Sequence, residues 1–270
     1  MRLTPRPSKS VWQKKLKMYK IAIIKYLEEH GFEAFRPKAV LFDMDGVLYD
    51  SMPNHAIAWQ ESMAKFGIHM TADDAYATEG ARGVDTIRLM VLQQLHREID
   101  EAEAQRMYDE KSRIFHSLPE APIMPGILDL MKQIQAAGIL CSIVTGSGQL
   151  PLIERLKKDF GAFVDEAHIT TAYDVKCGKP SPDPYLTGLR KAGDLQPYEA
   201  IVVENAPLGV RAGHAAAIFT IAVNTGPLAN EELLGAGADL IFPTMEELSR
   251  QWQKLVPTLS FNHTPSSSVT

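Results

Sequence analysis

Two aspartates, Asp43 and Asp45, are separated by one residue and directly follow the apolar run 39–42. Alternate residues of an extended backbone point to the same side, so both carboxylates are expected to face one way. Gly46 lets the chain turn sharply just after them. Two acids this close need a cation or a shared proton, and a carboxylate beside a hard cation such as Mg²⁺ can attack phosphorus. The pattern predicts phosphoryl transfer, with a simple Asp/Gly turn after a strand as the plainer alternative.

A second apolar run, 140–144, is followed by the small polar residues Thr145, Gly146 and Ser147. Their hydroxyls and backbone N–H groups could hold a phosphoryl oxygen ahead of a helix N-terminus. Small residues follow many buried strands, so this signal gains weight only beside other site residues.

Two further candidates lie later in the chain. Lys179 belongs to the proline-rich loop 176–184, which could fix its ammonium against the same phosphate, although a loop lysine is ordinarily exposed. Glu204 and Asn205 follow the apolar run 200–203 and offer a carboxylate and an amide oxygen to a hard cation. The alternative for Asn205 is a helix cap.

These residues can meet only if the apolar runs before them lie in one sheet. The predicted strands are 39–42, 140–144, a short one near 169, 200–203, 219–223 and 240–241. They alternate with helical segments, which predicts an α/β fold with a doubly wound, parallel, Rossmann-like sheet and helices on both faces. Ligands bind at the carboxyl ends of the strands in such sheets, so we expect the site at that edge.

A wholly helical region interrupts this alternation after the first strand. Residues 53–119 contain four helical segments and no strand pattern, which predicts a cap domain beside a core made of 37–52 and 120–256. Residues 1–36 form an N-terminal extension whose apolar spacing predicts one amphipathic helix. Residues 257–270 are rich in Ser, Thr and Pro and are predicted to be disordered.

Charge is unevenly distributed along the chain. The first 40 residues hold ten Lys/Arg against three Asp/Glu, a charge of +7, and the remainder holds 18 against 30, a charge of −12. We favour docking of the basic helix on the main body over RNA or membrane binding. No apolar run approaches the roughly 18 residues of a membrane span. Cys141 and Cys177 form neither a disulfide framework nor a zinc pair. We therefore expect a cytoplasmic monomer that binds neither nucleic acid nor membrane.

Four signals, D-x-D-G, T-G-S, K-P and E-N-x-x-x-G, occur in order and each ends or follows a strand pattern. Together they resemble the motifs of the haloacid dehalogenase superfamily of phosphotransferases, over about residues 38–255. The helical insertion after the first strand and the run 179–183 are similar to its β-phosphoglucomutase branch. The resemblance implies the same fold, Mg²⁺ as cofactor and a small phosphorylated substrate.

The resemblance also implies roles for individual residues. Asp43 would be the nucleophile, Asp45 the acid/base, and His55 a cap residue that helps to orient Asp45 when the cap closes. The phosphate would be bound by Thr145, Gly146, Ser147 and Lys179. Mg²⁺ would be held by Asp43, the Asp45 carbonyl, Glu204 and Asn205. The peptide between Lys179 and Pro180 would be cis.

Two departures from the family pattern bear on the substrate. Asn205 stands where an Asp is usual, which removes one negative charge from the metal site. In the cap, Arg82 does not fall squarely on the arginine by which the mutases grip a second phosphate. Asn205, Glu79 and Lys111 together resemble a bacterial inorganic pyrophosphatase of this superfamily, in which a cap glutamate reaches the metal on closure. Glu79 is thus an expected metal ligand, and the expected cap residues facing the substrate are His55, Glu79, Arg82 and Lys111.

We therefore expect a Mg²⁺-dependent phosphohydrolase that forms an aspartyl-phosphate and acts on inorganic pyrophosphate. The alternative is a β-phosphoglucomutase or a sugar-phosphate phosphatase, which would share the first half-reaction. A non-catalytic regulatory or scaffold protein is the remaining alternative, because Asn205 departs from the usual metal ligands.

Overall fold

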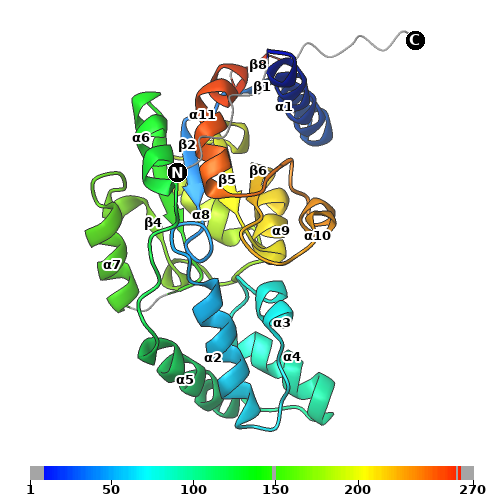
Figure 1. The fold of residues 1–270 in the computed structure, drawn as a ribbon, viewed down its shortest axis with the longest axis vertical. Helices are drawn as coiled ribbons and strands as arrows, with labels where there is room; N and C mark the ends of the chain where they lie inside the picture. The colour runs from blue at the N-terminus through cyan, green and yellow to red at the C-terminus, as the bar shows by residue number, and fades with distance from the viewer. Residues whose placement is uncertain (1–8, 148–149, 260, 263–270) are drawn as a thin grey trace.

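The computed structural model describes residues 9–147, 150–259 and 261–262. Figure 1 shows a sheet with helices on both sides and a separate helical bundle at one end of it. The bundle consists of α2 (Met52–Ala64), α3 (Ala72–Ala77), α4 (Gly83–Leu95) and α5 (Glu101–Ser117). Its chain leaves the core after the first strand of the main sheet and returns before the second, which confirms the helical cap in the predicted fold class.

The main sheet has six strands in the order β4-β3-β2-β5-β6-β7, and all neighbours are parallel. They are β2 (Ala39–Phe42), β3 (Leu140–Val144), β4 (Ile169–Thr170), β5 (Ala200–Glu204), β6 (Phe219–Val223) and β7 (Leu240–Phe242). Ala39 pairs with Leu140 on one side and with Ala200 on the other, so β2 lies inside the sheet. All of β2 is buried, which explains its unbroken apolar sequence.

Helices cover both faces of the sheet. Val40 and Phe42 of β2 pack in one apolar cluster, while Ala39 and Leu41 pack in another. The helices of the first cluster are α1 (Lys9–His30), α6 (Ile127–Ala136), α7 (Leu150–Phe160) and α11 (Met245–Leu259). The opposite side has α8 (Asp183–Lys191), α9 (Pro207–Ala215) and α10 (Asn230–Gly235). The sheet is therefore doubly wound, as the alternation of strands and helices predicted.

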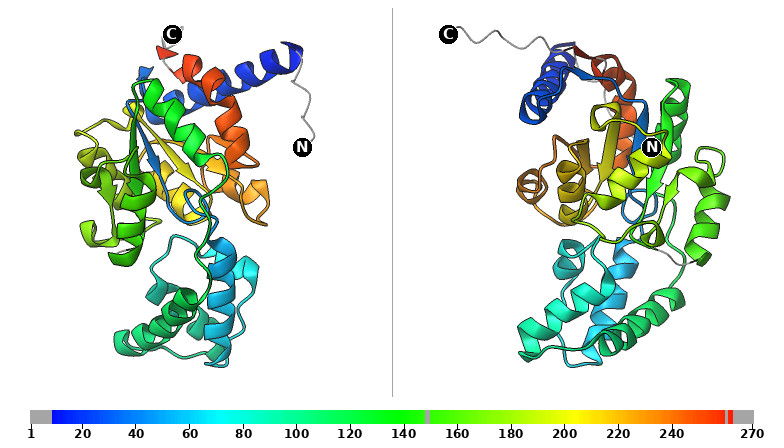
Figure 2. Two further views of the ribbon diagram at one scale, coloured as in Figure 1. Left: turned by 60° about the vertical axis from the view of Figure 1, so that its left-hand side comes forward. Right: turned by 180° about the vertical axis from the view of Figure 1, so that it is seen from behind.

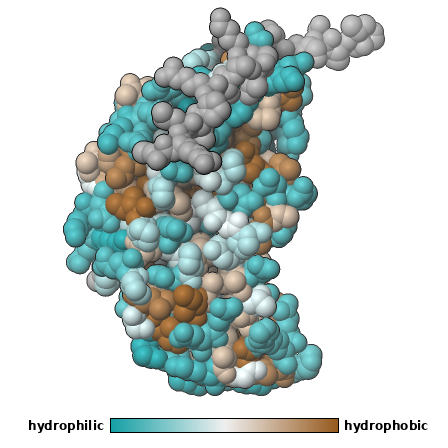
Figure 3. All heavy atoms as spheres, in the orientation of Figure 1, coloured by the Kyte–Doolittle hydropathy of each residue, from teal (hydrophilic) through white to brown (hydrophobic). Residues whose placement is uncertain are grey.

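The cap has an apolar cluster of its own, which includes Trp59, Ile87 and Met107. Thr71 and Asp74 form a capping box at the start of α3. Figure 2 shows the cap below the core in both views. In Figure 3, hydrophilic residues cover most of the visible surface of both parts, as expected when each buries its own apolar side chains.

The N-terminal helix α1 is part of the core packing. Tyr19, Ile23 and Tyr26 are fully buried in the same cluster as the sheet. The chain then forms β1 (Ala34–Phe35), which pairs antiparallel with β8 (Phe261–Asn262). The sequence did not predict this two-stranded sheet, because strands of two residues are too short to show an alternation of apolar and polar residues.

The prediction of a disordered tail from 257 is wrong for the described part of that segment. Helix α11 continues to Leu259, and the strand β8 follows. The reason is tertiary, since β8 finds its partner strand more than 200 residues earlier in the chain. Residues 260 and 263–270 lie outside the described residues.

Three 3₁₀ helices complete the structure: η1 (Glu166–His168), η2 (Ala172–Asp174) and η3 (Pro197–Glu199). Among the described residues, no helix is both long enough and apolar enough to cross a membrane.

Candidate active site

The carboxyl ends of neighbouring parallel strands bring the predicted site residues together. Asp43 directly follows β2, and its backbone N–H still donates to the Val203 carbonyl of β5 at 3.0 Å. Gly46 turns the chain with a φ of +76°, and a Cβ there would lie 2.1 Å from Asn205 Nδ2. Gly46 is therefore required twice, for the turn and for the space that the Asn205 side chain occupies.

Lys179 reaches into this site and joins two carboxylates. Its Nζ lies 2.5 Å from Asp43 Oδ1 and 2.5 Å from Glu204 Oε1. The residue is only 4% exposed, and the peptide to Pro180 is cis, as the family resemblance implied. Burial lowers the pKa of Lys179, but the charges of Asp43 and Glu204 outweigh it and raise the pKa above its ordinary value. Lys179 is therefore a buried ammonium at this site.

Glu204 accepts hydrogen bonds at both carboxylate oxygens. Besides Lys179, Oε1 accepts from the Tyr185 hydroxyl at 2.6 Å, and Oε2 accepts from the next two backbone N–H groups at 3.0 and 3.5 Å. A Cβ at Gly209 would lie 1.8 Å from Oε1, so the glycine of E-N-x-x-x-G makes room for this carboxylate. In the structure Glu204 holds Lys179, and its role as a metal ligand stays a prediction.

Asp45 is joined to the cap by a chain of polar contacts. The Ser51 hydroxyl donates to Asp45 Oδ1 at 2.5 Å, and His55 Nε2 lies 3.2 Å from the same oxygen. His55 Nδ1 lies 2.8 Å from Lys111 Nζ. We assign the neutral imidazole with its proton on Nε2, because Nδ1 can then accept from the ammonium. The chain runs from Lys111 on α5 through His55 on α2 to Asp45.

Aromatic rings surround the Lys111 ammonium. Its Nζ lies 5.1 Å from the ring centroid of Trp59, 4.9 Å from that of Phe115 and 5.9 Å from that of Tyr108. Burial lowers the pKa of Lys111 to about 8, although nearby acids favour the charged form. The ring faces attract a cation and partly replace its lost water.

Glu79 lies in the cavity between cap and core. The cavity has a volume of about 80 Å³, and Asp43, Asp45, Glu79 and Lys111 are among its lining residues. Burial raises the pKa of Glu79 well above its ordinary value, and the charges of Asp45 and Asp43 raise it further. The structure therefore brings the predicted cap glutamate to the two aspartates of the core.

The two aspartates differ in their protonation behaviour. Burial and the charge of Glu204 raise the pKa of Asp43 to about 7, even with Lys179 beside it. Burial also raises the pKa of Asp45, but the contacts with His55 and Ser51 outweigh this and lower it overall. Neighbouring carboxyls with separated pKa values are typical of sites in which two acids have different chemical roles.

The T-G-S segment borders the same cavity. Thr145 is buried at the end of β3, and its Oγ1 accepts from the Ser147 backbone N–H at 3.0 Å. Gly146 and Ser147 line the cavity, and α7 begins shortly afterwards, at Leu150. Thr145 lines a neighbouring cavity. The role of these three residues in phosphate binding stays a prediction, and 148–149 lie outside the described residues.

Arg82 does not join the cavity around Asp43. Its side chain is half-exposed at the start of α4, with Nε 3.6 Å from Asp85 Oδ2. It lines a neighbouring cavity together with Gly146 and Lys179. Arg82 therefore lies near the predicted site but outside its centre.

Asn205 carries the observation that best fits a cation at this site. Its Oδ1 is buried and has no hydrogen-bond partner in the described structure, which is costly for a polar atom. Mg²⁺ prefers oxygen ligands of this kind. Among the described residues, the acids of this site do not form a group of three with ligand atoms within 4.8 Å of one another. An amide oxygen and a backbone carbonyl would therefore be needed to complete the ligands of an ion.

The sequence predicted no role for Ser51, for Tyr185 or for the rings around Lys111. The contact between Phe115 and Lys111 could have been predicted, because residues four apart lie on the same face of a helix. Tyr185 gives no such signal, because its contact with Glu204 depends on how α8 packs below the Lys179 loop.

Comparisons with known proteins agree with this geometry. The family model described as haloacid dehalogenase-like hydrolase matches residues 37–217. Hexitol phosphatase A of Escherichia coli K12 is 33% identical over 217 residues, covering 79% of this chain and 94% of the relative. Beta-phosphoglucomutase of Bacillus subtilis is 28% identical over 231 residues, covering 80% and 96%. A solved structure from Bacteroides vulgatus, described provisionally as a beta-phosphoglucomutase, is 46% identical with a TM-score of 0.85, covering 90% and 98%.

Proposed function

Since the chain belongs to the haloacid dehalogenase-like hydrolase family and is a phosphoryl-transfer enzyme, we propose that it is a Mg²⁺-dependent phosphatase of small phosphorylated carbohydrates. The central observation is the buried Asp43 carboxylate, held 2.5 Å from the Lys179 ammonium at the end of an inner strand. The names of the two curated relatives refer to hexitol and glucose phosphates, which supports this substrate class over the pyrophosphate that we first expected.

In the first step, Asp43 attacks phosphorus. One of its oxygens is held by Lys179, so the other forms the new bond while the bond to the leaving oxygen breaks. Asp45 gives a proton to the leaving oxygen. Asp45 then takes a proton from the water that attacks the aspartyl-phosphate, which releases inorganic phosphate and restores Asp43.

The chain of contacts to the cap supplies the proton that Asp45 needs. Asp45 is ionised in this arrangement, because His55 and Ser51 lower its pKa. His55 can pass its Nε2 proton to Asp45 while Nδ1 takes one from Lys111, whose pKa of about 8 suits a donor near neutral pH. Closure of the cap thus couples substrate enclosure to the relay through which Asp45 can be protonated.

Electrostatic positioning accounts for the rest of the mechanism. Lys179, the Thr145 hydroxyl and the Gly146 backbone N–H would bind the phosphoryl oxygens, and Glu204 keeps Lys179 in place. Mg²⁺ would be held by Asp43, the Asp45 carbonyl, Asn205 and, from the cap, Glu79. When bound, the ion offsets negative charge on the transferring phosphoryl group.

Inorganic pyrophosphate is a second candidate substrate, and one observation favours it. Glu79 and Lys111 line the cavity at the place where the leaving part of a substrate would lie. A carboxylate that binds the metal and an ammonium that binds a second phosphoryl group would suit a compact anion. Mutase activity has weaker support, because Arg82 lies outside this cavity and is paired with Asp85.

A substrate panel decides between these candidates. We would measure kcat/KM for a hexitol phosphate, hexose 6-phosphates, β-glucose 1-phosphate and pyrophosphate in wild type, Glu79→Gln and the exposed cap control Glu98→Gln. Our proposal requires a phosphorylated carbohydrate to be the best substrate. Pyrophosphate becomes the better candidate if its kcat/KM is the highest of the panel and Glu79→Gln lowers that kcat/KM at least tenfold, about 1.4 kcal/mol. The kcat/KM values for the sugar phosphates would then be unchanged by Glu79→Gln.

The covalent intermediate is tested separately. In Asp45→Asn, an activated phosphate ester with a good leaving group should phosphorylate Asp43 and leave it trapped, since the base for the second step is missing. Mass spectrometry of the digested protein locates the phosphate. Label on another residue, or release of phosphate without any label, would contradict the assigned nucleophile.

A further inference from the structure

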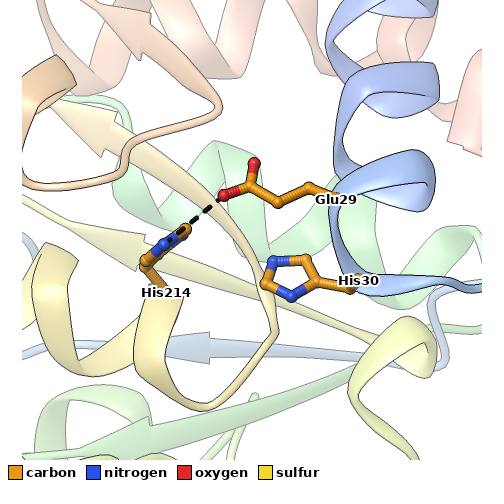
Figure 4. A group of neighbouring side chains, drawn as sticks. All are labelled: Glu29, His30 and His214. Atoms are coloured by element: carbon orange, nitrogen blue, oxygen red, sulfur yellow. Dashed lines mark ion pairs between the residues drawn. The ribbon is translucent and has the colours of Figure 1, made fainter.

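Two histidines and a glutamate meet on the core, where α1 and α9 end. Figure 4 shows Glu29 and His30 at the end of α1 facing His214 on α9. Glu29 Oε1 lies 3.6 Å from His214 Nε2, and one ligand atom from each residue lies within 4.8 Å of the others. In the described part of the chain, no other group of three or more His, Cys, Asp or Glu side chains meets this spacing.

The donor set is that of a transition-metal site. Two imidazole nitrogens and one carboxylate oxygen bind Zn²⁺ in proteins at about 2.1 Å and leave a fourth position for water. A tetrahedral ion with such bonds separates its ligand atoms by roughly 3.4 Å. The Glu29–His214 pair is already close to this distance. Both side chains are about 40% exposed, so small rotations can close the remaining gap.

Neighbouring groups lie against both histidine rings. The His30 ring lies 5.2 Å from the Tyr26 ring and 5.9 Å from the Phe32 ring, measured between centroids. A Cβ at Gly237 would lie 2.6 Å from His214 Cγ, so the backbone of that loop closely approaches the ring.

Several sources of negative potential converge on this place. The carboxyl ends of both α1 and α9 lie here, and helix C-termini attract cations. The acid Asp239 also interacts electrostatically with Glu29, and the positive charge of Lys25 acts on Asp239 in the opposite sense. A cation between Glu29 and the histidines would therefore lie in a favourable field.

We propose that Glu29, His30 and His214 form a Zn²⁺ site that fastens the N-terminal helix to α9, separate from the Mg²⁺ site at the sheet edge. The plainer alternative is an ion pair between Glu29 and His214 that docks the helix without metal. The two differ in one property, which is stoichiometric zinc binding by these three side chains.

Zinc titration of the full-length, tag-free chain tests the proposal. Calorimetry with ZnCl₂ in excess Mg²⁺ would be run on wild type, His214→Gln and Glu29→Gln, the last at an exposed position where folding is not at risk. His69→Gln, an exposed cap histidine, is the matched control. Imidazole resonances of His30 and His214, followed by NMR, identify which zinc-binding event belongs to this site.

We expect both site variants to weaken the Kd of that event at least roughly tenfold, and the control to leave it unchanged. Zinc should also raise the Tm of wild type more than that of His214→Gln, since a ligand that binds only the native state stabilises it. Zinc affinities of the two variants equal to wild type would overturn the proposal. Imidazole resonances of wild type that do not respond to zinc would do the same.

Discussion

Substitution of Asp43 by Asn is expected to abolish turnover and, at the same time, to stabilise the metal-free protein at alkaline pH. An amide is a poor nucleophile, so activity should fall by several orders of magnitude. Stability should rise because two buried carboxylates, Asp43 and Glu204, share one ammonium at 2.5 Å. The substitution leaves a balanced Lys179–Glu204 pair.

The magnitude follows from the pKa of Asp43. Folding raises it from 3.8 to about 7, mainly through burial and the charge of Glu204. A raised acid pKa means stability that is fully present below about pH 4 and is lost as pH rises through about 7. The full shift corresponds to on the order of 4 kcal/mol. Because a buried site relaxes around a charge, we expect Asp43→Asn to add about 1–3 kcal/mol at pH 8 and less at pH 5.

Urea unfolding followed by circular dichroism, in EDTA at pH 5 and pH 8, measures this difference. Asp129→Asn on α6 is the matched control, because its side chain is 76% exposed and should change little. Added Mg²⁺ should stabilise wild type more than Asp43→Asn, because a ligand that binds the native state raises the free energy of unfolding more when it binds more tightly. A variant less stable than wild type at pH 8 would refute the electrostatic reasoning. Turnover above a tenth of wild type would refute the assignment of the nucleophile.

Three further substitutions test the other groups of the site. Asp45→Asn should slow turnover by roughly 10² to 10⁴, with Mg²⁺ affinity by titration close to wild type because the expected ligand is the backbone carbonyl. Lys179→Met should lower the free energy of unfolding by about 3–5 kcal/mol at pH 8, as measured by urea unfolding. In the double variant with Glu204→Gln, stability should be restored, while kinetics should show that activity is not. Lys111→Met should raise the pKa of His55, because the Lys111 ammonium lowers that pKa in the wild type. The same substitution should slow turnover at least roughly tenfold. An unchanged NMR titration of His55 would contradict the contact between the two residues.

The fold and the family could be predicted because their signals are local. The apolar runs before Asp43, Thr145 and Glu204 are strands buried on both faces, and such strands have little freedom to be anything else. Once these strands are parallel neighbours, their carboxyl ends must meet, which brought Asp43 and Glu204 to one edge. The haloacid dehalogenase resemblance was confirmed on this basis.

The substrate was harder to predict than the fold. Glu79 does reach the cavity, but the relatives named above refer to phosphorylated carbohydrates, so pyrophosphate stays a second candidate. One acid in a cap loop cannot fix a substrate from sequence. Its effect depends on how closely the cap approaches the core and on which groups face it, and both are properties of packing between domains.

Sequence by itself determined the alternation of strands and helices, the inserted cap and the residues that end each strand, because each follows from local period and chain direction. Only the tertiary structure decided that Glu204 holds Lys179, that β8 pairs with β1, and that Glu29 and His30 face His214 across more than 180 residues of chain. These contacts come from the docking of helices and loops on a common core. Docking depends on many weak contacts at once, and no period or motif in the chain encodes it.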